Sequence, residues 1–160
     1  DLGLDVSLIL MIVQYAAAHG KARIGFIEST ATDWVNRGIS TIAAADKELN
    51  QMAMSEQAWG IVCSAFGFGK RKPSKNELNL SLMWVDEWKM SREMLTAAYN
   101  ACVDGISKFD MKYVSKILEN WHEKGYKTPD DIEEKKNSGG EKESFAAYDI
   151  DLFEKMLNSD

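Results

Sequence analysis

The sequence predicts an all-α protein, and three observations support that fold class. Apolar residues recur at three- and four-residue spacing along the whole chain. No segment alternates apolar and polar residues as a half-buried strand would. Only two prolines interrupt the 160 residues, and apolar residues make up 45% of them, which is ample for a core.

The first part of the chain predicts four helices. Apolar residues at helical spacing from Leu4 to Tyr15 form the first, which Gly20 ends. The second runs from Ile24 to Trp34 and stops at Gly38, since glycine adopts the left-handed conformation at little cost. A third helix, capped by a threonine, is expected over 41–54, and a fourth over 55–66.

Four more helices are predicted beyond the loop GFGKRKPSK at 67–75. Ser74 with Glu77 forms a capping box that begins the fifth, with Leu78, Leu82, Val85 and Trp88 on its apolar face. Ser91 caps the sixth, and Asp110 caps the seventh, which Gly125 ends. Thr128-Pro129 opens a short eighth helix, DDIEEKK, with its acids first as the helix dipole prefers.

The composition changes after residue 136. Residues 137–144, NSGGEKES, read as a flexible linker. Residues 145–160 predict an acidic amphipathic tail that is too short to hold a helix alone, so we expect it to order by docking on a neighbouring copy or a partner. Because the chain begins at Asp1 without Met, we expect a fragment of a longer protein.

One phrase of the sequence occurs twice, 87 residues apart: FIESTATDWVNRGIST from Phe26 and YVSKILENWHEKGYKT from Tyr113. Residues 5–41 align with 92–128 without a gap. The identical pairs are Leu8/Leu95, Lys21/Lys108, Trp34/Trp121, Gly38/Gly125 and Thr41/Thr128. We interpret these segments as two copies of one helical unit: residues 1–54 are the C-terminal part of a truncated first copy, and residues 55–136 are the second.

The second copy carries a recognisable set of motifs. An FG pair precedes a Ser-capped helix that holds Glu77 and Trp84, a YxxxIxxxW helix contains Tyr113, Ile117 and Trp121, and the ending KGxKT spans 124–128. Together these features resemble the DnaD-like domain of replication-initiation proteins from Gram-positive bacteria, their phages and mobile elements. The first copy departs from the pattern, with Phe26 in place of Tyr and Thr30 in place of Ile.

The resemblance implies a primosome component that is not an enzyme and uses no cofactor. Such a protein binds DNA, with single strands preferred, and forms a homo-oligomer. Its protein partners would be the replication initiator and the replicative helicase or helicase loader, and its role would be to help recruit or load the helicase. In the family, the YxxxIxxxW region and the basic segment after it are associated with single-stranded DNA.

The motif residues share one helix face, and such a stripe is more often core than stacking platform. We therefore expect Tyr113, Ile117, Trp121, Phe26 and Trp34 to be structural. The DNA-binding role then passes to basic residues, which are Lys108, Lys112, Lys116, Lys124 and Lys127 around the motif and Lys70, Arg71 and Lys72 in the loop, with Lys75 beside them.

A simpler interpretation of these lysines is a solvated face, because Glu119 and Glu123 share that surface. The first copy has Gly25 and Ser29 at the positions of Lys112 and Lys116. If DNA binds, we expect the second copy to bind it and the first to be a packing or assembly unit.

Charge and motif content exclude several classes of function. The net charge of −6 lies entirely in residues 130–160, since residues 1–129 sum to zero, so DNA binding would need a local basic patch. No Walker loop, Ser-His-Asp set or HExxH motif is present. Cys63 and Cys102 are typical of buried thiols in a reducing cytoplasm, and two histidines give no structural zinc site. No run of 18 apolar residues predicts a membrane span.

Two functions from different classes remain open. One is a DNA-binding module that helps to load a helicase. The other is a scaffold whose helical repeats and acidic tail join primosome partners without direct DNA contact. Local basic charge favours the first, whereas the zero net charge of residues 1–129 favours the second.

Overall fold

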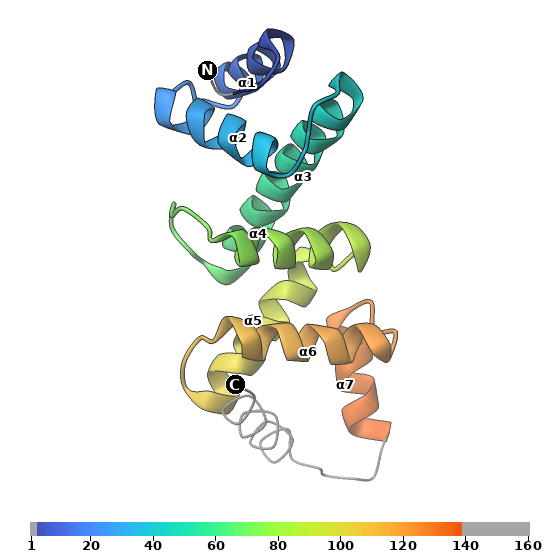
Figure 1. The fold of residues 1–160 in the computed structure, drawn as a ribbon. Coiled ribbons are helices and arrows are strands. Elements are labelled where there is room, and N and C mark those ends of the chain that lie inside the picture. The colour runs from blue at the N-terminus through green and yellow to red at the C-terminus, as the bar shows by residue number, and fades with distance from the viewer. Residues whose placement is uncertain (1–2, 139–160) are drawn as a thin grey trace. The chain divides into compact units, whose positions relative to one another are not determined.

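The computed structural model describes residues 3–138, and every regular element in that range is helical (Figure 1), so the all-α prediction is confirmed. The elements are α1 (Val6–Ala18), α2 (Ile24–Asn36), α3 (Ile42–Phe66), α4 (Lys75–Leu82), the π-helix η1 (Met83–Glu87), α5 (Arg92–Ile106), α6 (Met111–Glu123) and α7 (Pro129–Ser138). α7 runs two residues past its predicted end. The rest of the linker and the tail lie outside the described residues.

The predicted helix starts are confirmed by their hydrogen bonds. The Ser74 hydroxyl accepts from the Glu77 N–H at 3.1 Å, while a Glu77 carboxylate oxygen accepts from the Ser74 N–H at 3.0 Å, which completes the capping box. Ser91 accepts from the Met94 N–H at 3.1 Å in the same way. Asp110 accepts from the Tyr113 N–H at 3.0 Å, so each cap satisfies a backbone donor that its helix leaves unpaired.

The repeated phrase marks the end of a helix in both places. Gly125 has a φ of +74°, and the N–H of Tyr126 donates to the Trp121 carbonyl at 2.9 Å. Gly38 has a φ of +72°, and the N–H of Ile39 donates to the Trp34 carbonyl at 2.9 Å. Both are Schellman caps, in which the left-handed glycine lets the chain turn back on its last helical carbonyls. Helices α2 and α6 also begin and end 87 residues apart.

The predicted break between a third and a fourth helix at Met54 and Ser55 is wrong. Instead, α3 is a single helix of 25 residues. No glycine or proline lies between Ile42 and Ala58, and NQMAM at 50–54 contains good helix formers. Ser55 is buried inside the helix, so a residue that resembled a cap in sequence continues the helical backbone.

The predicted fifth helix is also modified, because it ends in a π-turn. The N–H of Trp88 donates to the Met83 carbonyl at 2.9 Å, an i+5 spacing that closes η1. Trp84 is fully buried and fills the core here. The residues predicted as the apolar face of this helix, Leu78, Leu82, Val85 and Trp88, are only partly buried.

The chain divides into two compact units, Asp1–Met54 and Ser55–Asp160, and the division falls within α3. It coincides with the residue at which the predicted second copy begins, although the derivation of both units from one repeat remains an interpretation. In the first unit, α1 packs on α2, and the core consists of Leu8, Ile12, Ala31, Trp34 and Ala45.

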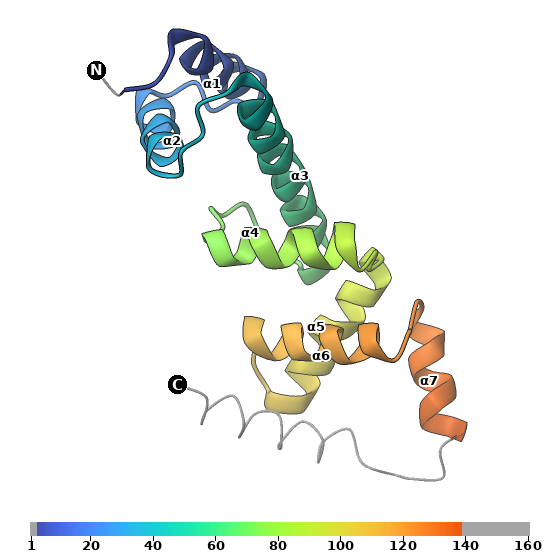
Figure 2. The ribbon, with the colours of Figure 1, turned by 45° about the vertical axis from the view of Figure 1, so that its right-hand side comes forward.

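The second unit is built around α5, which packs on both α6 and α7 (Figures 1 and 2). Its core receives Trp59 and Phe66 from the last part of α3, and Trp84 from η1. α5 and α6 complete it with the buried residues Met94, Leu95, Ala98, Cys102, Tyr113, Val114, Ile117, Leu118 and Trp121. This core fixes the orientation of α6, whose outer face carries the predicted lysines.

Candidate nucleic-acid interface

Helix α6 separates the aromatic motif from the lysines. Tyr113 and Ile117 are buried in the core of the second unit, and Trp121 is only 4% exposed. At helical spacing, the residues just before the first two, Lys112 and Lys116, lie away from that core and are exposed. The motif therefore lies inside the fold, where its rings are not accessible for stacking on a nucleic-acid base, whereas the lysines face solvent.

The corresponding residues of the first unit are less uniform. Trp34 is fully buried, as Trp121 nearly is. Phe26 is half-buried and stacks on Tyr15 with the ring centroids 6.4 Å apart. Thr30, at the position of Ile117, donates a hydrogen bond from its hydroxyl to the Phe26 carbonyl at 2.8 Å. The first unit thus has a hydrogen-bonded polar side chain where the second unit packs an aliphatic one.

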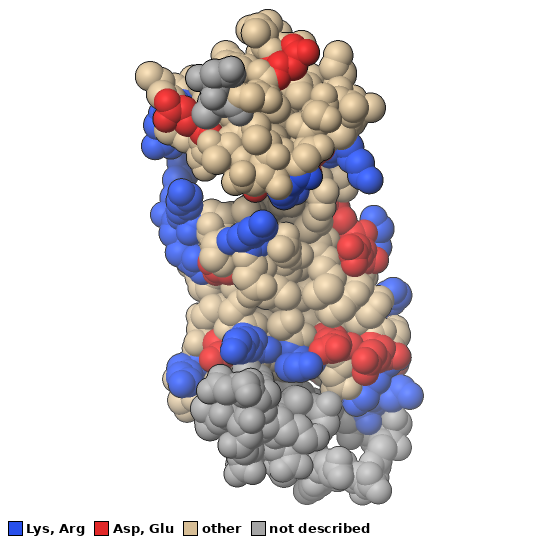
Figure 3. All heavy atoms as spheres, in the orientation of Figure 1, with Lys and Arg blue, Asp and Glu red and all other residues tan. Residues whose placement is uncertain are grey.

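The exposed face of α6 is basic in its first half and mixed further along. Lys112 has no ion-pair partner among residues 3–138, while Lys116 pairs with Glu119 at 3.1 Å. Figure 3 shows basic side chains over the first half of α6 and acidic ones over its second half. An exposed ion pair such as Lys116–Glu119 contributes little to stability. The Lys116 ammonium can therefore leave the Glu119 carboxylate and pair with a phosphate instead.

Among the loop residues, Arg71 differs from its neighbours because its charge is already balanced. Its guanidinium donates to both carboxylate oxygens of Glu77, at 2.9 and 2.5 Å. It also lies over the rings of Trp59 and Phe68, 4.9 and 5.0 Å from their centroids. The hydrogen bonds from Arg71 hold the pKa of Glu77 at about 2, well below its ordinary value. Arg71 is therefore exposed but held to Glu77 and to the two rings, so it stabilises the loop.

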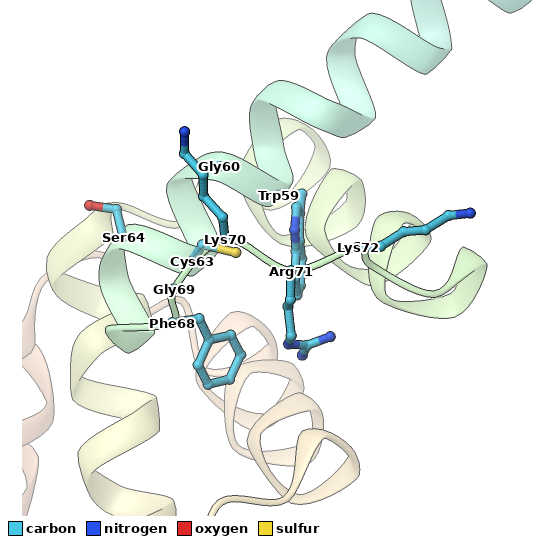
Figure 4. Close-up of a pocket in the computed structure, with 9 residues that line it drawn as sticks. All are labelled: Trp59, Gly60, Cys63, Ser64, Phe68, Gly69, Lys70, Arg71 and Lys72. Atoms are coloured by element: carbon cyan, nitrogen blue, oxygen red, sulfur yellow. The ribbon is translucent and has the colours of Figure 1, made fainter. Parts of the chain in front are cut away.

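The loop and the last turns of α3 enclose an open cavity of about 600 Å³ (Figure 4). α3 contributes Trp59, Gly60, Cys63 and Ser64, and the loop contributes residues 68–72. Lys70 and Lys72 are exposed at its edge, and in Figure 4 their side chains point in other directions than Arg71. Trp59 and Phe68 were not among the predicted site residues, although aromatic residues that flank a glycine-rich basic loop are a signal present in the sequence.

Aromatic contacts bring the loop beside the start of α6. The rings of Phe68 and Phe109 meet edge to face with centroids 5.0 Å apart, and Phe66 and Tyr99 each lie 5.6 Å from Phe109. Lys108 immediately precedes Phe109 and is exposed. The loop that carries Lys70 and Lys72 is therefore joined at Phe68 to the turn that carries Lys108. We call Lys70, Lys72, Lys108, Lys112 and Lys116 the basic strip.

The remaining predicted lysines lie at the far end of α6. Lys124 is eight residues beyond Lys116, the nearest lysine of the strip, which is about 12 Å along a helix axis. Its ammonium lies over the Tyr126 ring at 5.9 Å, and Lys127 is exposed nearby. At this end His122 stacks on Trp88, with the ring centroids 4.6 Å apart. Lys124 and Lys127 are therefore separate from the basic strip.

Within the part of the chain that the structure describes, no group of three or more His, Cys, Asp or Glu side chains could hold a metal ion. The Cys102 thiol is buried and donates to the Lys108 carbonyl at 3.3 Å, so it braces the turn that carries Lys108. Burial raises the pKa of the Cys63 thiol. None of the described helices is both long and apolar enough to cross a membrane.

Comparison with known proteins gives one family match. The model of a family described as replication initiation and membrane attachment matches residues 1–49 and 68–136. The two matched segments end 87 residues apart, the same offset that relates the repeated phrases and the ends of α2 and α6. No curated protein and no solved structure matches the chain.

Proposed function

This chain belongs to the replication initiation and membrane attachment family, which is DnaD-like, and on that premise we propose that it is a non-catalytic DNA-binding component of a replication-initiation complex. Its second unit contacts DNA through the basic strip. Its partners are the initiator and the helicase or helicase loader, and several copies act together. Single strands are the preferred form of DNA.

The observation that carries the proposal is the arrangement of α6. The stacking-type residues of the motif are in the core, whereas Lys112 and Lys116 are exposed one turn apart on the opposite face. Lysine ammonium groups bind phosphates as point charges and carry no base specificity. The proposed contact is therefore electrostatic, independent of sequence and strongly weakened by salt.

The basic loop extends this contact. The contact between Phe68 and Phe109 supports this extension, because it joins the loop that carries Lys70 and Lys72 to the turn that carries Lys108. The strip holds five lysines while the whole of residues 1–129 has no net charge. Because residues 1–129 have no net charge, a nucleic-acid contact needs a local patch of positive charge, and these lysines are the candidates for it.

A charge-reversal experiment tests the proposal. Lys112→Glu with Lys116→Glu should weaken binding of a fluorescent single-stranded oligonucleotide in anisotropy titrations, equally for all sequences. The dependence of log affinity on log salt should fall by about one for each phosphate that the protein no longer neutralises. Titrating a duplex of the same sequence alongside measures the strand preference.

The first unit supplies a matched control, because Gly25 and Ser29 occupy the positions of Lys112 and Lys116 and both are exposed. Gly25→Glu with Ser29→Glu should leave binding nearly intact. Equal weakening by both pairs would show that DNA binds elsewhere than on α6.

The alternative is a scaffold that joins replication proteins without touching DNA. The pairing of Arg71 with Glu77 and of Lys116 with Glu119 favours it, since both reduce the available positive charge. If no oligonucleotide binds even at low salt, while a pull-down with the initiator or the helicase loader succeeds, the scaffold becomes the better account.

A further inference from the structure

The first unit exposes apolar side chains that its own fold leaves uncovered. Among the described residues, seven large hydrophobic side chains are exposed, and all of them lie in the first unit: Val6, Leu10, Val13, Ile24, Val35, Ile42 and Met54. In the described part of the second unit, the large hydrophobic side chains are buried or half-buried. The exposed apolar surface is therefore a property of one unit.

Three of these residues form a stripe along α1. Val6 is 69% exposed, Leu10 54% and Val13 38%, and Ala17 extends the line and is also exposed. At 100° per residue these four positions fall within about 60° of the helix circumference. The buried residues Leu8, Ile12 and Tyr15 lie on the opposite side. α1 thus has two apolar faces, and only one packs within the unit.

Comparison with the second unit shows that the fold does not require an apolar outer face. At the offset of 87, the stripe corresponds to Glu93, Ala97, Asn100 and Asp104 of α5. There Glu93, Asn100 and Asp104 are exposed and polar, and Ala97 is half-buried. α5 packs on α6 and α7, and of these four positions only Ala97 packs against the core, while the three polar ones remain in solvent. The apolar stripe of α1 consequently serves a contact outside the unit.

The pattern of the stripe specifies the kind of partner. Its spacing of four, three and four residues is that of a coiled-coil seam, which fits the side of another helix. α1 contains no charged residue, so the stripe matches an identical uncharged face without repulsion. It also has no Lys, Arg or Trp, the residues by which a helix lying on a lipid surface is held there.

We infer that α1 pairs with α1 of a second copy of this chain through Val6, Leu10, Val13 and Ala17, in a two-fold symmetric contact. This rests on the self-association in the proposed function and names its surface. A helix of 13 residues is only about 20 Å long, so the contact is smaller than that of a permanent dimer. Pairing is therefore weak in dilute protein and favoured where copies gather on one DNA.

Sedimentation of the full chain over a series of micromolar concentrations tests the inference. The wild type should show a concentration-dependent monomer–dimer equilibrium. Leu10→Asp with Val13→Asp should weaken it about tenfold or more, since each places a charge in an apolar seam. The matched control is Asn100→Asp, at the α5 position that corresponds to Val13, because Asn100 is exposed and polar; it should leave the equilibrium unchanged.

A second variant tests the same contact in case the double aspartate variant does not fold. In a Cys63→Ser background, Leu10→Cys should give a cross-linked dimer with a short bis-maleimide, whereas Asn100→Cys should not. A wild type that stays monomeric throughout, or equal weakening by the α1 aspartate pair and by Asn100→Asp, overturns the inference.

Two further measurements separate the alternatives. Co-sedimentation of a monomeric wild type with anionic phospholipid vesicles, abolished by Leu10→Asp with Val13→Asp, would assign the stripe to lipid and overturn self-pairing. Oligonucleotide binding measured on the same variants distinguishes failure of pairing from failure of the proposed DNA contact, because the two surfaces are on different units.

Discussion

Trp34 and Trp121 occupy equivalent places, one turn before a glycine whose φ lies in the left-handed region. Trp34 is fully buried and Trp121 is 4% exposed, and the carbonyl of each accepts a hydrogen bond from the residue after that glycine. A tryptophan so placed contributes through the area that it buries. The repeated aromatic phrase is thus explained by the core and the helix end.

Trp121→Ala should lower the free energy of unfolding by about 3–5 kcal/mol, as expected for truncation of a large core side chain. Chemical denaturation followed by circular dichroism measures the change. Trp88→Ala is the control, because Trp88 is half-buried and stacks on an exposed His122, and it should cost clearly less. A Trp121→Ala protein that keeps its stability but no longer binds oligonucleotide would instead place Trp121 against the DNA.

Glu77 should make stability depend on pH in the acid range. Its pKa in the folded state is about 2, below the ordinary value of 4.5, mainly through the hydrogen bonds from Arg71. A lowered pKa means that this contribution is complete above about pH 4.5 and is lost as the pH falls towards 2. Glu77→Gln should cost about 1–2 kcal/mol at neutral pH, a modest value because the Arg71 side chain is 43% exposed.

The same substitution should flatten the loss of stability between pH 4.5 and 2, measured by urea unfolding at several pH values. Glu119→Gln is the comparison, since Glu119 pairs with Lys116 in an exposed position, and it should change stability by less than about 0.5 kcal/mol. Identical acid behaviour of wild type and Glu77→Gln would contradict the assignment of this pKa.

At the scale of whole elements, helix ends are set by short sequence signals. The Schellman caps at Gly38 and Gly125 combine a left-handed glycine with a helical carbonyl that accepts from the N–H of the residue after that glycine. A Cβ at either glycine would meet no atom within 4 Å, so any cost of a side chain there comes from the backbone conformation alone.

Gly125→Ala and Gly38→Ala should therefore each destabilise their unit by about 1 kcal/mol, the cost of holding an L-residue in the left-handed region. Gly60→Ala within α3 is the matched control, because that glycine has ordinary helical backbone and open space around its Cα. It should stabilise the helix by about 0.5–1 kcal/mol. Thermal unfolding of the three variants checks both the sign and the ordering.

At the scale of the whole chain, charge and apolar surface are distributed unequally. The basic strip belongs to the second unit, and the exposed apolar residues belong to the first. The net negative charge lies in residues 130–160. This division favours separate roles in DNA contact and assembly for the two units.

Deleting residues 141–160 should tighten oligonucleotide binding at low salt, because the segment carries six acids and two bases. The gain should shrink at high salt, since screening weakens repulsion between separated charges. Anisotropy titrations at two salt concentrations measure both effects. Unchanged affinity at low salt would show that the acidic segment does not compete with DNA, and pull-downs with the truncated chain would then test its predicted docking on a partner.

Local signals in the sequence determined most of the helix boundaries. Ser74, Ser91 and Asp110 were identified as caps, and Gly38 and Gly125 as stops, because each acts through hydrogen bonds to residues within five positions. The same locality explains the failure at Ser55. A serine can cap a helix or continue one, and burial among distant residues decided that it continues α3.

Tertiary structure decided how the candidate site is assembled. The sequence supplied the lysines but could not show that Arg71 is balanced by Glu77, or that Phe68 on Phe109 brings the loop to Lys108. It also placed an apolar pattern in α1 without showing that Leu10 faces solvent while Leu8 is buried. Spacing determines which residues share a helix face, whereas only the packing of separate helices determines which face is covered and which charges remain available to a ligand.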